Sequence, residues 1–224
     1  MVIDKTNFPI YACMILLSLI LGALFIYIYL RKQSIEKKYV LIYILMMVIY
    51  SIICGIVLDS IINKRSNSVI GLSSYGGAIG VILSAIIFEK MHSSDGLIIK
   101  SAIISLPLIY SISKIGCFLA GCCYGIPFNG AFSVTYTAGL NIPLVPVQLL
   151  ETIVFMLIFI VCVLFRKKYR IIGITLVLSA IGKFLLDFLR YSHLNEIIST
   201  NQIISITFII IGIVLILKPK IIKK

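Results

Sequence analysis

Charged residues are scarce in this sequence: they account for 12% of its 224 residues, whereas 61% are hydrophobic. A soluble domain of this size needs far more charge on its water-facing surface, so the composition excludes one. The net charge of +12 does not indicate a nucleic-acid partner, because the basic residues cluster in short stretches between long apolar runs. The sequence therefore predicts an all-α, polytopic membrane protein that does not bind nucleic acid.

Histidine is nearly absent, with two residues, and the six cysteines include no CxxC pair. Cys117, Cys122 and Cys123 are close together in the sequence, but neither histidine is near them. The adjacent pair could form a disulfide only with local strain. We therefore expect no metal site and no cofactor, and we assign these cysteines to packing.

Seven apolar runs have about the 20-residue length that a helix needs to cross a bilayer. Lysine and arginine gather in four of the connecting or terminal stretches, at 31–38, 89–100, 166–170 and 218–224. The positive-inside rule places these stretches in the cytoplasm, with the amino terminus outside and the carboxyl terminus inside. The predicted spans are Pro9–Leu30, Tyr39–Ile62, Val69–Phe88, Ile98–Leu119, Pro146–Phe165, Ile171–Leu189 and Ile203–Leu217.

No repeat, low-complexity tract or linker divides the chain, so residues 1–224 are expected to form a single transmembrane domain. The first span is not expected to be a cleaved signal peptide, because its apolar run is long and no small-residue cleavage site follows it. The longest outward stretch, 125–146, has no charged residue. Its polar and aromatic composition predicts a short segment that lies at the membrane surface.

Ionisable residues inside the spans are informative, because each costs about 2.5–3.5 kcal/mol on insertion scales. At a rise of about 1.5 Å per residue, Lys114 and Lys183 lie roughly 21 and 20 Å above the cytoplasmic cations that begin their spans. Glu151 and Tyr75 lie about 22 Å from the nearest cytoplasmic cations in their own spans. Four helices thus place polar groups in one layer, in the outer half of the bilayer. The alternative is that the lysines extend toward the interface and that Glu151 is held in interfacial water.

Two spans also place several polar residues on one face. Lys183, Asp187 and Arg190 are spaced four and three apart, which favours a cationic stripe that suits an anionic ligand such as a lipid phosphate. The alternative is that the last two merely mark the end of a span. Gln148 and Glu151 are three apart, so both can point into a cavity.

Glycines flank these polar groups in the third span and around 113–125. Glycine lets a backbone or a lipid headgroup approach closely, and irregular backbone is tolerated at this depth where it lines a cavity. Helix packing is the alternative explanation for the glycines of the third span. The candidates are Gly76, Gly77, Gly116, Gly121 and Gly125.

Three stretches, GCFLAGCCYG (116–125), PVQLLE (146–151) and GKFLLDFLR (182–190), resemble the prolipoprotein diacylglyceryl transferase family. The resemblance extends from about Tyr11 to Arg190. Members share seven helices with the amino terminus outside, as the apolar runs predict for this chain. The resemblance implies transfer of a diacylglyceryl group from phosphatidylglycerol to the thiol of a lipobox cysteine, without a metal or a nucleotide. It also implies a multi-pass protein of the bacterial cell membrane whose active site faces the outer leaflet.

The family pattern also implies roles for individual residues. Lys114 and Lys183 occupy positions where family members carry arginine, and lysine lacks the planar fork that grips phosphate in two places. Tyr75 occupies the position of a family histidine. The resemblance implies catalytic roles for Lys114, Lys183, Tyr75 and Glu151, and substrate contacts from Tyr11, Gly76, Gly77, Gly116, Gly121, Gly125, Gln148, Asp187 and Arg190.

Two other functions are compatible with the same residues. One is a non-catalytic membrane protein of this fold that binds lipid or peptide. The other is a membrane thiol oxidoreductase that uses the cysteines of 117–123. Transfer of lipid to a lipobox peptide would distinguish the enzyme from both.

Overall fold

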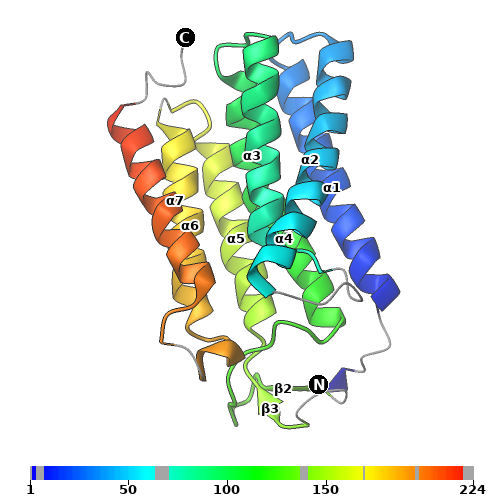
Figure 1. Ribbon diagram of the computed structural model, residues 1–224, viewed down its shortest axis with the longest axis vertical. Helices are drawn as coiled ribbons and strands as arrows, with labels where there is room; N and C mark the ends of the chain where they lie inside the picture. The colour runs from blue at the N-terminus through cyan, green and yellow to red at the C-terminus, as the bar shows by residue number, and fades with distance from the viewer. Residues whose placement is uncertain are drawn as a thin grey trace.

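The computed structural model describes residues 2–3, 8–63, 71–136, 141–168, 170–194 and 197–218. This part of the chain forms a bundle of seven α-helices that lie side by side, with a small sheet at one end (Figure 1). The predicted all-α, polytopic fold class is confirmed, and each predicted span corresponds to one helix. The helices are α1 (Phe8–Arg31), α2 (Lys37–Asn63), α3 (Ser74–Met91), α4 (Leu97–Leu119), α5 (Val147–Leu164), α6 (Ile171–Asp187) and α7 (Thr200–Leu217).

Two helices begin where a polar side chain caps them rather than where the apolar run begins. Helix α3 begins at Ser74, and the side chain of Ser73 accepts a hydrogen bond from the backbone N–H of Gly76. The residue predicted to begin this span, Val69, lies outside the described residues. Helix α7 begins three residues before the predicted Ile203, because Ser199 and Gln202 form a capping box. Such caps satisfy free backbone N–H groups, and hydropathy does not detect them.

Six of these helices are long and apolar enough to cross a membrane. Helix α6 has 17 residues, which corresponds to a length of about 25 Å. It is therefore somewhat shorter than the hydrocarbon core of a typical bilayer, which is about 30 Å thick.

Large apolar side chains cover the outside of the bundle. Leu45, Ile153, Leu157 and Ile210, which come from α2, α5 and α7, are each more than half exposed. A continuous apolar surface of this kind is unfavourable in water and suits the acyl chains of a bilayer. The chain is therefore a multi-pass membrane protein. Inside the bundle, α4 is central and packs against α1, α3, α5 and α6.

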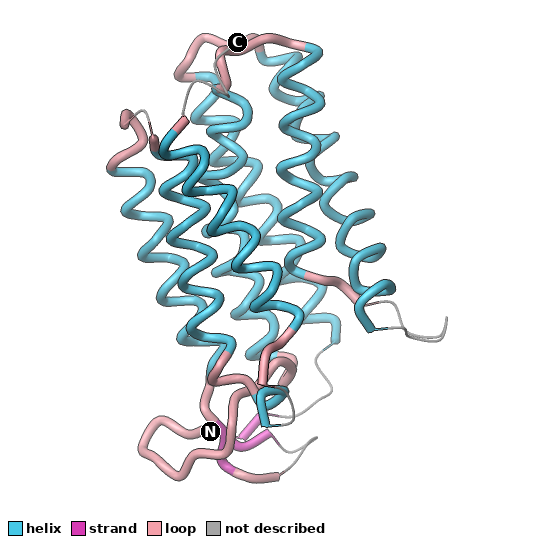
Figure 2. The backbone as a smooth tube through the Cα atoms, turned by 60° about the vertical axis from the view of Figure 1, so that its left-hand side comes forward, coloured by secondary structure: helices cyan, strands magenta, loops and turns pink. Residues whose placement is uncertain are grey.

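A three-stranded sheet lies at the end of the bundle where the amino terminus is found (Figures 1 and 2). Strand β1 (Val2–Ile3) pairs in parallel with β2 (Val134–Tyr136), which pairs in antiparallel with β3 (Pro143–Leu144). Buried side chains of β2 and β3 pack against Phe118 near the end of α4. Much of the segment predicted to lie at the membrane surface is therefore folded onto this end of the bundle. Helix α7 ends at the opposite end (Figure 1).

Candidate active site

Glu151 is the centre of a buried cluster of charges. It lies in the second turn of α5, and its side chain is fully buried. Its Oε2 lies 3.0 Å from Lys114 Nζ, and its Oε1 lies 2.6 Å from Lys183 Nζ and 3.0 Å from an Nη atom of Arg190. Three cations from different segments thus share one carboxylate.

The three cations reach Glu151 from three directions. Lys114 comes from α4 and Lys183 from α6, while Arg190 lies in the turn after α6. Both lysines are buried, with 3% and 4% of their surface exposed, so neither side chain extends to water or lipid. Sequence spacing had placed Lys114, Lys183 and Glu151 in one layer, and the structure brings their charged atoms into direct contact.

Tyr110 joins this cluster, although the sequence patterns did not single it out. Its hydroxyl donates to Glu151 Oε1 at 2.8 Å and accepts from Lys183 Nζ at 2.5 Å. Both lysine Nζ atoms also lie near the face of its ring, 5.0 Å (Lys114) and 5.1 Å (Lys183) from the centroid. Tyr110 is four residues before Lys114 in α4, so the shared helical face was a signal that could have identified it.

Asp187 forms a second buried carboxylate beside the first. Its Oδ1 lies 3.3 Å from Arg190 Nε, so Arg190 connects the two carboxylates. Ser199, the cap of α7, donates its hydroxyl to Asp187, and Asn201 donates its side-chain amide at 3.3 Å. These two partners come from beyond the loop that follows α6, and spacing along the chain did not predict them.

The charges of the cluster do not cancel. With Lys114, Lys183 and Arg190 protonated and with Glu151 and Asp187 ionised, three positive and two negative charges leave a net charge of +1. The Nε of Arg190 is buried and faces Asp187 rather than open space. A buried excess of positive charge favours the binding of an anion.

Gln148 and Gly121 shape the turn that follows α4. Gly121 has a φ of 64°, and the N–H groups of Gly121 and Cys122 bond back to the carbonyls of Phe118 and Cys117. This is the glycine-ended Schellman arrangement that terminates a helix. The side-chain amide of Gln148 donates to the carbonyl of Cys122 at 2.6 Å, which ties the turn to the start of α5.

Tyr136 completes the polar contacts of Gln148 at the end of the bundle that carries the small sheet. Its hydroxyl donates to Gln148 Oε1 at 3.3 Å. Burial raises the pKa of the Tyr136 hydroxyl to about 12, so this group stays a neutral donor at neutral pH. Gln148 is thus occupied by protein groups on both its oxygen and its nitrogen.

Tyr75 contacts the neighbouring helix rather than the three cations. Its hydroxyl forms a hydrogen bond with Ser205 of α7, and its ring stacks on Phe208 with centroids 6.2 Å apart. Tyr11 lies half-buried in α1, where its backbone carbonyl is near Gly116. Tyr75 is not among the described contacts of Glu151.

The predicted glycines differ in their surroundings. A Cβ on Gly76 would lie 2.3 Å from the carbonyl oxygen of Cys54, and one on Gly116 would lie 2.7 Å from Met14 Cβ, so both glycines allow close helix packing. A Cβ on Gly125 would lie 2.6 Å from the carbonyl oxygen of Val145. Its N–H donates to that oxygen, and Gly125 also forms a β-bridge with Arg190. At Gly77 the nearest backbone atom would be 3.8 Å away, which leaves ordinary space.

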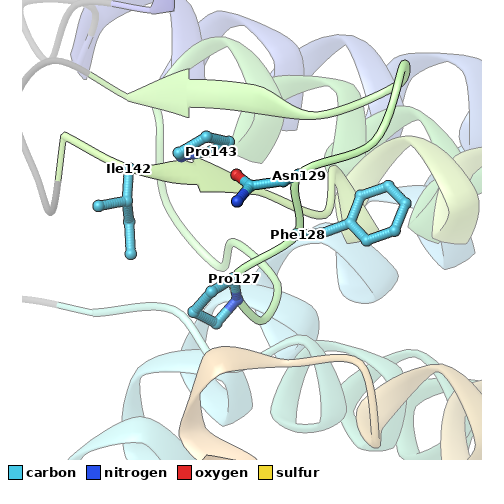
Figure 3. Close-up of a pocket in the computed structure, with 5 residues that line it drawn as sticks. All are labelled: Pro127, Phe128, Asn129, Ile142 and Pro143. Atoms are coloured by element: carbon cyan, nitrogen blue, oxygen red, sulfur yellow. The ribbon is translucent and has the colours of Figure 1, made fainter.

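A pocket of about 260 Å³ lies beside the small sheet, apart from the charged cluster. Figure 3 shows that the backbone around 127–129 and the strand at 143 form its walls. The lining is apolar except for one amide side chain. Its residues are Pro127, Phe128, Asn129, Ile142 and Pro143.

Comparisons with known proteins identify similar chains. A model of the prolipoprotein diacylglyceryl transferase family matches residues 1–218. A Clostridium tetani (strain Massachusetts / E88) protein named phosphatidylglycerol–prolipoprotein diacylglyceryl transferase is 33% identical over 217 residues, which cover 86% of this chain and 87% of that protein.

Two further relatives are similar over a shorter region. A protein of Clostridium perfringens (strain 13 / Type A), named phosphatidylglycerol–prolipoprotein diacylglyceryl transferase 2, is 27% identical over 156 residues, which cover 65% of this chain and 61% of that protein. The corresponding protein of Tolumonas auensis (strain DSM 9187 / NBRC 110442 / TA 4) is 25% identical over 159 residues, which cover 66% of this chain and 62% of that protein. The match spans less than two thirds of the length of these two relatives.

Proposed function

Because the chain belongs to the prolipoprotein diacylglyceryl transferase family, we propose that it transfers a diacylglyceryl group from phosphatidylglycerol to the cysteine thiol of a prolipoprotein. The acceptor is a precursor peptide that carries a lipobox. The reaction takes place in the bacterial cell (inner) membrane. No cofactor enters this proposal.

The observation that carries the proposal is the unbalanced charge around Glu151. A phosphodiester headgroup carries one negative charge, equal and opposite to the net +1 of the cluster. Lys114, Lys183 and Arg190 would therefore bind the phosphate of the lipid. Glu151 would hold the three cations close together before the lipid arrives, since unpaired cations at this spacing would repel one another.

In the proposed reaction, negative charge develops on the glycerol phosphate that leaves. The acceptor sulfur forms a bond with the glycerol carbon that bears the phosphate, while the bond from that carbon to the phosphate oxygen breaks. Glycerol phosphate leaves with the electron pair, and the thiol proton is released or taken up by the leaving group. Cations fixed beside the phosphate stabilise the added charge on the leaving group, and they also favour the thiolate form of the acceptor.

The remaining predicted residues surround this centre in the proposal. Tyr75 and Tyr11 would face the lipid or the acceptor peptide from α3 and α1. Gly77 would leave space for the headgroup, and Asp187 would orient Arg190. The other substrate-contact candidates would act mainly through shape, by closing the helix contacts and the turn beside the lysines: Gly76, Gly116, Gly121, Gly125 and Gln148.

The orientation of the site follows from the charge pattern of the chain. The basic stretches 31–38 and 166–168 connect helices at the end of the bundle opposite the small sheet. Under the positive-inside rule that end faces the cytoplasm. The charged cluster, which lies toward the sheet, would then face the outer leaflet, where exported precursors meet lipid.

Incubation of the purified protein with a lipobox peptide in phosphatidylglycerol vesicles tests the proposal. Mass spectrometry should detect a peptide whose mass has increased by that of a diacylglyceryl group, together with released glycerol phosphate. Vesicles of a zwitterionic phospholipid serve as the control. If bound phosphatidylglycerol co-purifies but no peptide is modified, the chain is instead a lipid-binding member of the family. A lipid-free protein without transfer activity would contradict both functions.

A further inference from the structure

Three cysteine side chains meet at the outward end of α4. Cys117 lies in the last turn of the helix, and Cys122 and Cys123 follow directly after Gly121. Their three Sγ atoms all lie within 4.8 Å of one another. The sequence predicts a packing role for these residues, because no CxxC pair and no nearby histidine accompany them. The helix end that brings the three side chains together is not evident from their spacing.

The backbone conformation explains how adjacent cysteines can face the same point. In extended backbone, the side chains of neighbouring residues point to opposite sides. Cys123 instead has a φ of 57°, a left-handed conformation that is unfavourable for a residue with a Cβ. Unfavourable backbone of this kind persists where the surrounding structure or a bound group requires it.

The spacing of the sulfur atoms is close to that of a metal–thiolate centre. At a Zn–S distance of about 2.3 Å, two thiolates in tetrahedral geometry are about 3.8 Å apart. The distances between the three Sγ atoms would therefore have to shorten by less than about 1 Å to bind the ion. Thiolates select soft ions such as Zn(II) and Cu(I), whereas Mg(II) and Ca(II) require oxygen ligands.

The surroundings of the three thiols permit an ion to enter and stay. Cys123 is exposed and Cys122 half-buried, whereas Cys117 is buried, so the group opens toward the outward face. Three thiolates and one such ion carry a net negative charge. Lys114 lies three residues before Cys117 on the same face of α4, so the net positive cluster around Glu151 is close to the three thiols.

We propose that Cys117, Cys122 and Cys123 form a binding site for one thiophilic d10 ion, Zn(II) or Cu(I). The ion connects the last turn of α4 to the turn that Gln148 holds against α5. It would thereby fix the backbone next to the charged cluster. The site is independent of the proposed transfer reaction, and its test uses neither lipid substrate nor acceptor peptide.

Thiol labelling of the wild-type protein tests this directly. The reduced, purified protein is incubated with Zn(II), with Cu(I) or with neither ion, and then labelled with a maleimide and mapped by mass spectrometry. When the free concentration of the ion is ten times its dissociation constant, the rate at which Cys122 and Cys123 are labelled should fall about tenfold. Cys13, which is exposed on α1, should label at the same rate throughout. The ion that protects at the lower free concentration is the preferred one.

Two results would overturn the proposal. One is the absence of protection by either ion, or equal protection of Cys13. The other is a disulfide among Cys117, Cys122 and Cys123 that forms in air as fast with excess Zn(II) as without it.

Variants provide a second readout. The ion should raise the thermal midpoint of the wild type and of Cys13→Ser. It should not raise that of the triple variant with serine at 117, 122 and 123. If the triple variant fails to fold, the wild-type labelling still decides. An equal thermal shift in all three proteins would contradict the site.

Discussion

Replacement of Glu151 by glutamine is the most direct test of the charged cluster, because it removes a charge and keeps the side-chain shape. In the native protein three cations contact this carboxylate, the nearest of them at 2.6 Å. After Glu151→Gln, Asp187 alone opposes three cations, and the net charge of the cluster rises from +1 to +2. Removal of one partner from a buried ion pair costs about 3–5 kcal/mol. This corresponds to a loss of roughly two to four decades in the folding equilibrium.

Thermal denaturation in detergent, measured beside the transfer assay, would detect this loss. The matched control is Glu36→Gln, which changes an exposed glutamate before α2. A double variant that adds Lys114→Met to Glu151→Gln returns the net charge to +1. It should therefore regain part of the thermal stability, but it should not regain transfer, because it lacks a proposed phosphate contact. The reasoning is refuted if Glu151→Gln alone matches the wild type in both stability and transfer.

Three other perturbations have defined outcomes. Lys114→Ala or Lys183→Ala removes a charge-assisted contact worth about 1.5–3 kcal/mol, so kcat/KM for phosphatidylglycerol should fall roughly tenfold to a hundredfold or more, with Lys38→Ala as the exposed control. The corresponding arginine variants should preserve or raise kcat/KM, and an arginine that abolishes the activity would indicate a site shaped around a compact ammonium. Tyr110→Phe keeps the ring near both lysines and loses the hydroxyl that bonds Lys183 and Glu151, so stability in detergent should fall by about 1.5–3 kcal/mol; an unchanged thermal midpoint would contradict this contact. Ser199→Ala removes both a helix cap and a partner of Asp187, which should lower stability by about 0.5–2 kcal/mol, whereas Ser199→Thr should keep most of it in the same denaturation measurement.

The sequence predicts the bundle well, because lipid-facing helices must be continuously apolar for about 20 residues. It also placed Lys114, Glu151 and Lys183 at one depth, since the helical rise is constant. The same arithmetic applied to neighbours on the helix face would have included Tyr110. These features depend on periodicity within single helices, which a sequence records directly.

Other features depend on how separate segments fold onto each other. Ser199 meets Asp187 because the chain between α6 and α7 turns back, and no spacing rule specifies that turn. The pairing of β1 with β2 joins segments more than 130 residues apart. The left-handed backbone at Cys123, which brings the three thiols together, cannot be predicted from the sequence pattern.

Helix α6 has a consequence for the lipid around it. Its 17 residues extend over about 25 Å, and its outer face, which includes Leu178, Ile181 and Leu185, is exposed. Acyl chains that border a short apolar surface compress to match it, which thins the membrane locally by a few ångströms. Hydrophobic mismatch along α6 would thereby lower the phosphate of a neighbouring lipid toward the depth of Lys183. Local thinning of the bilayer would thus shorten the distance between the lipid headgroup and a buried lysine.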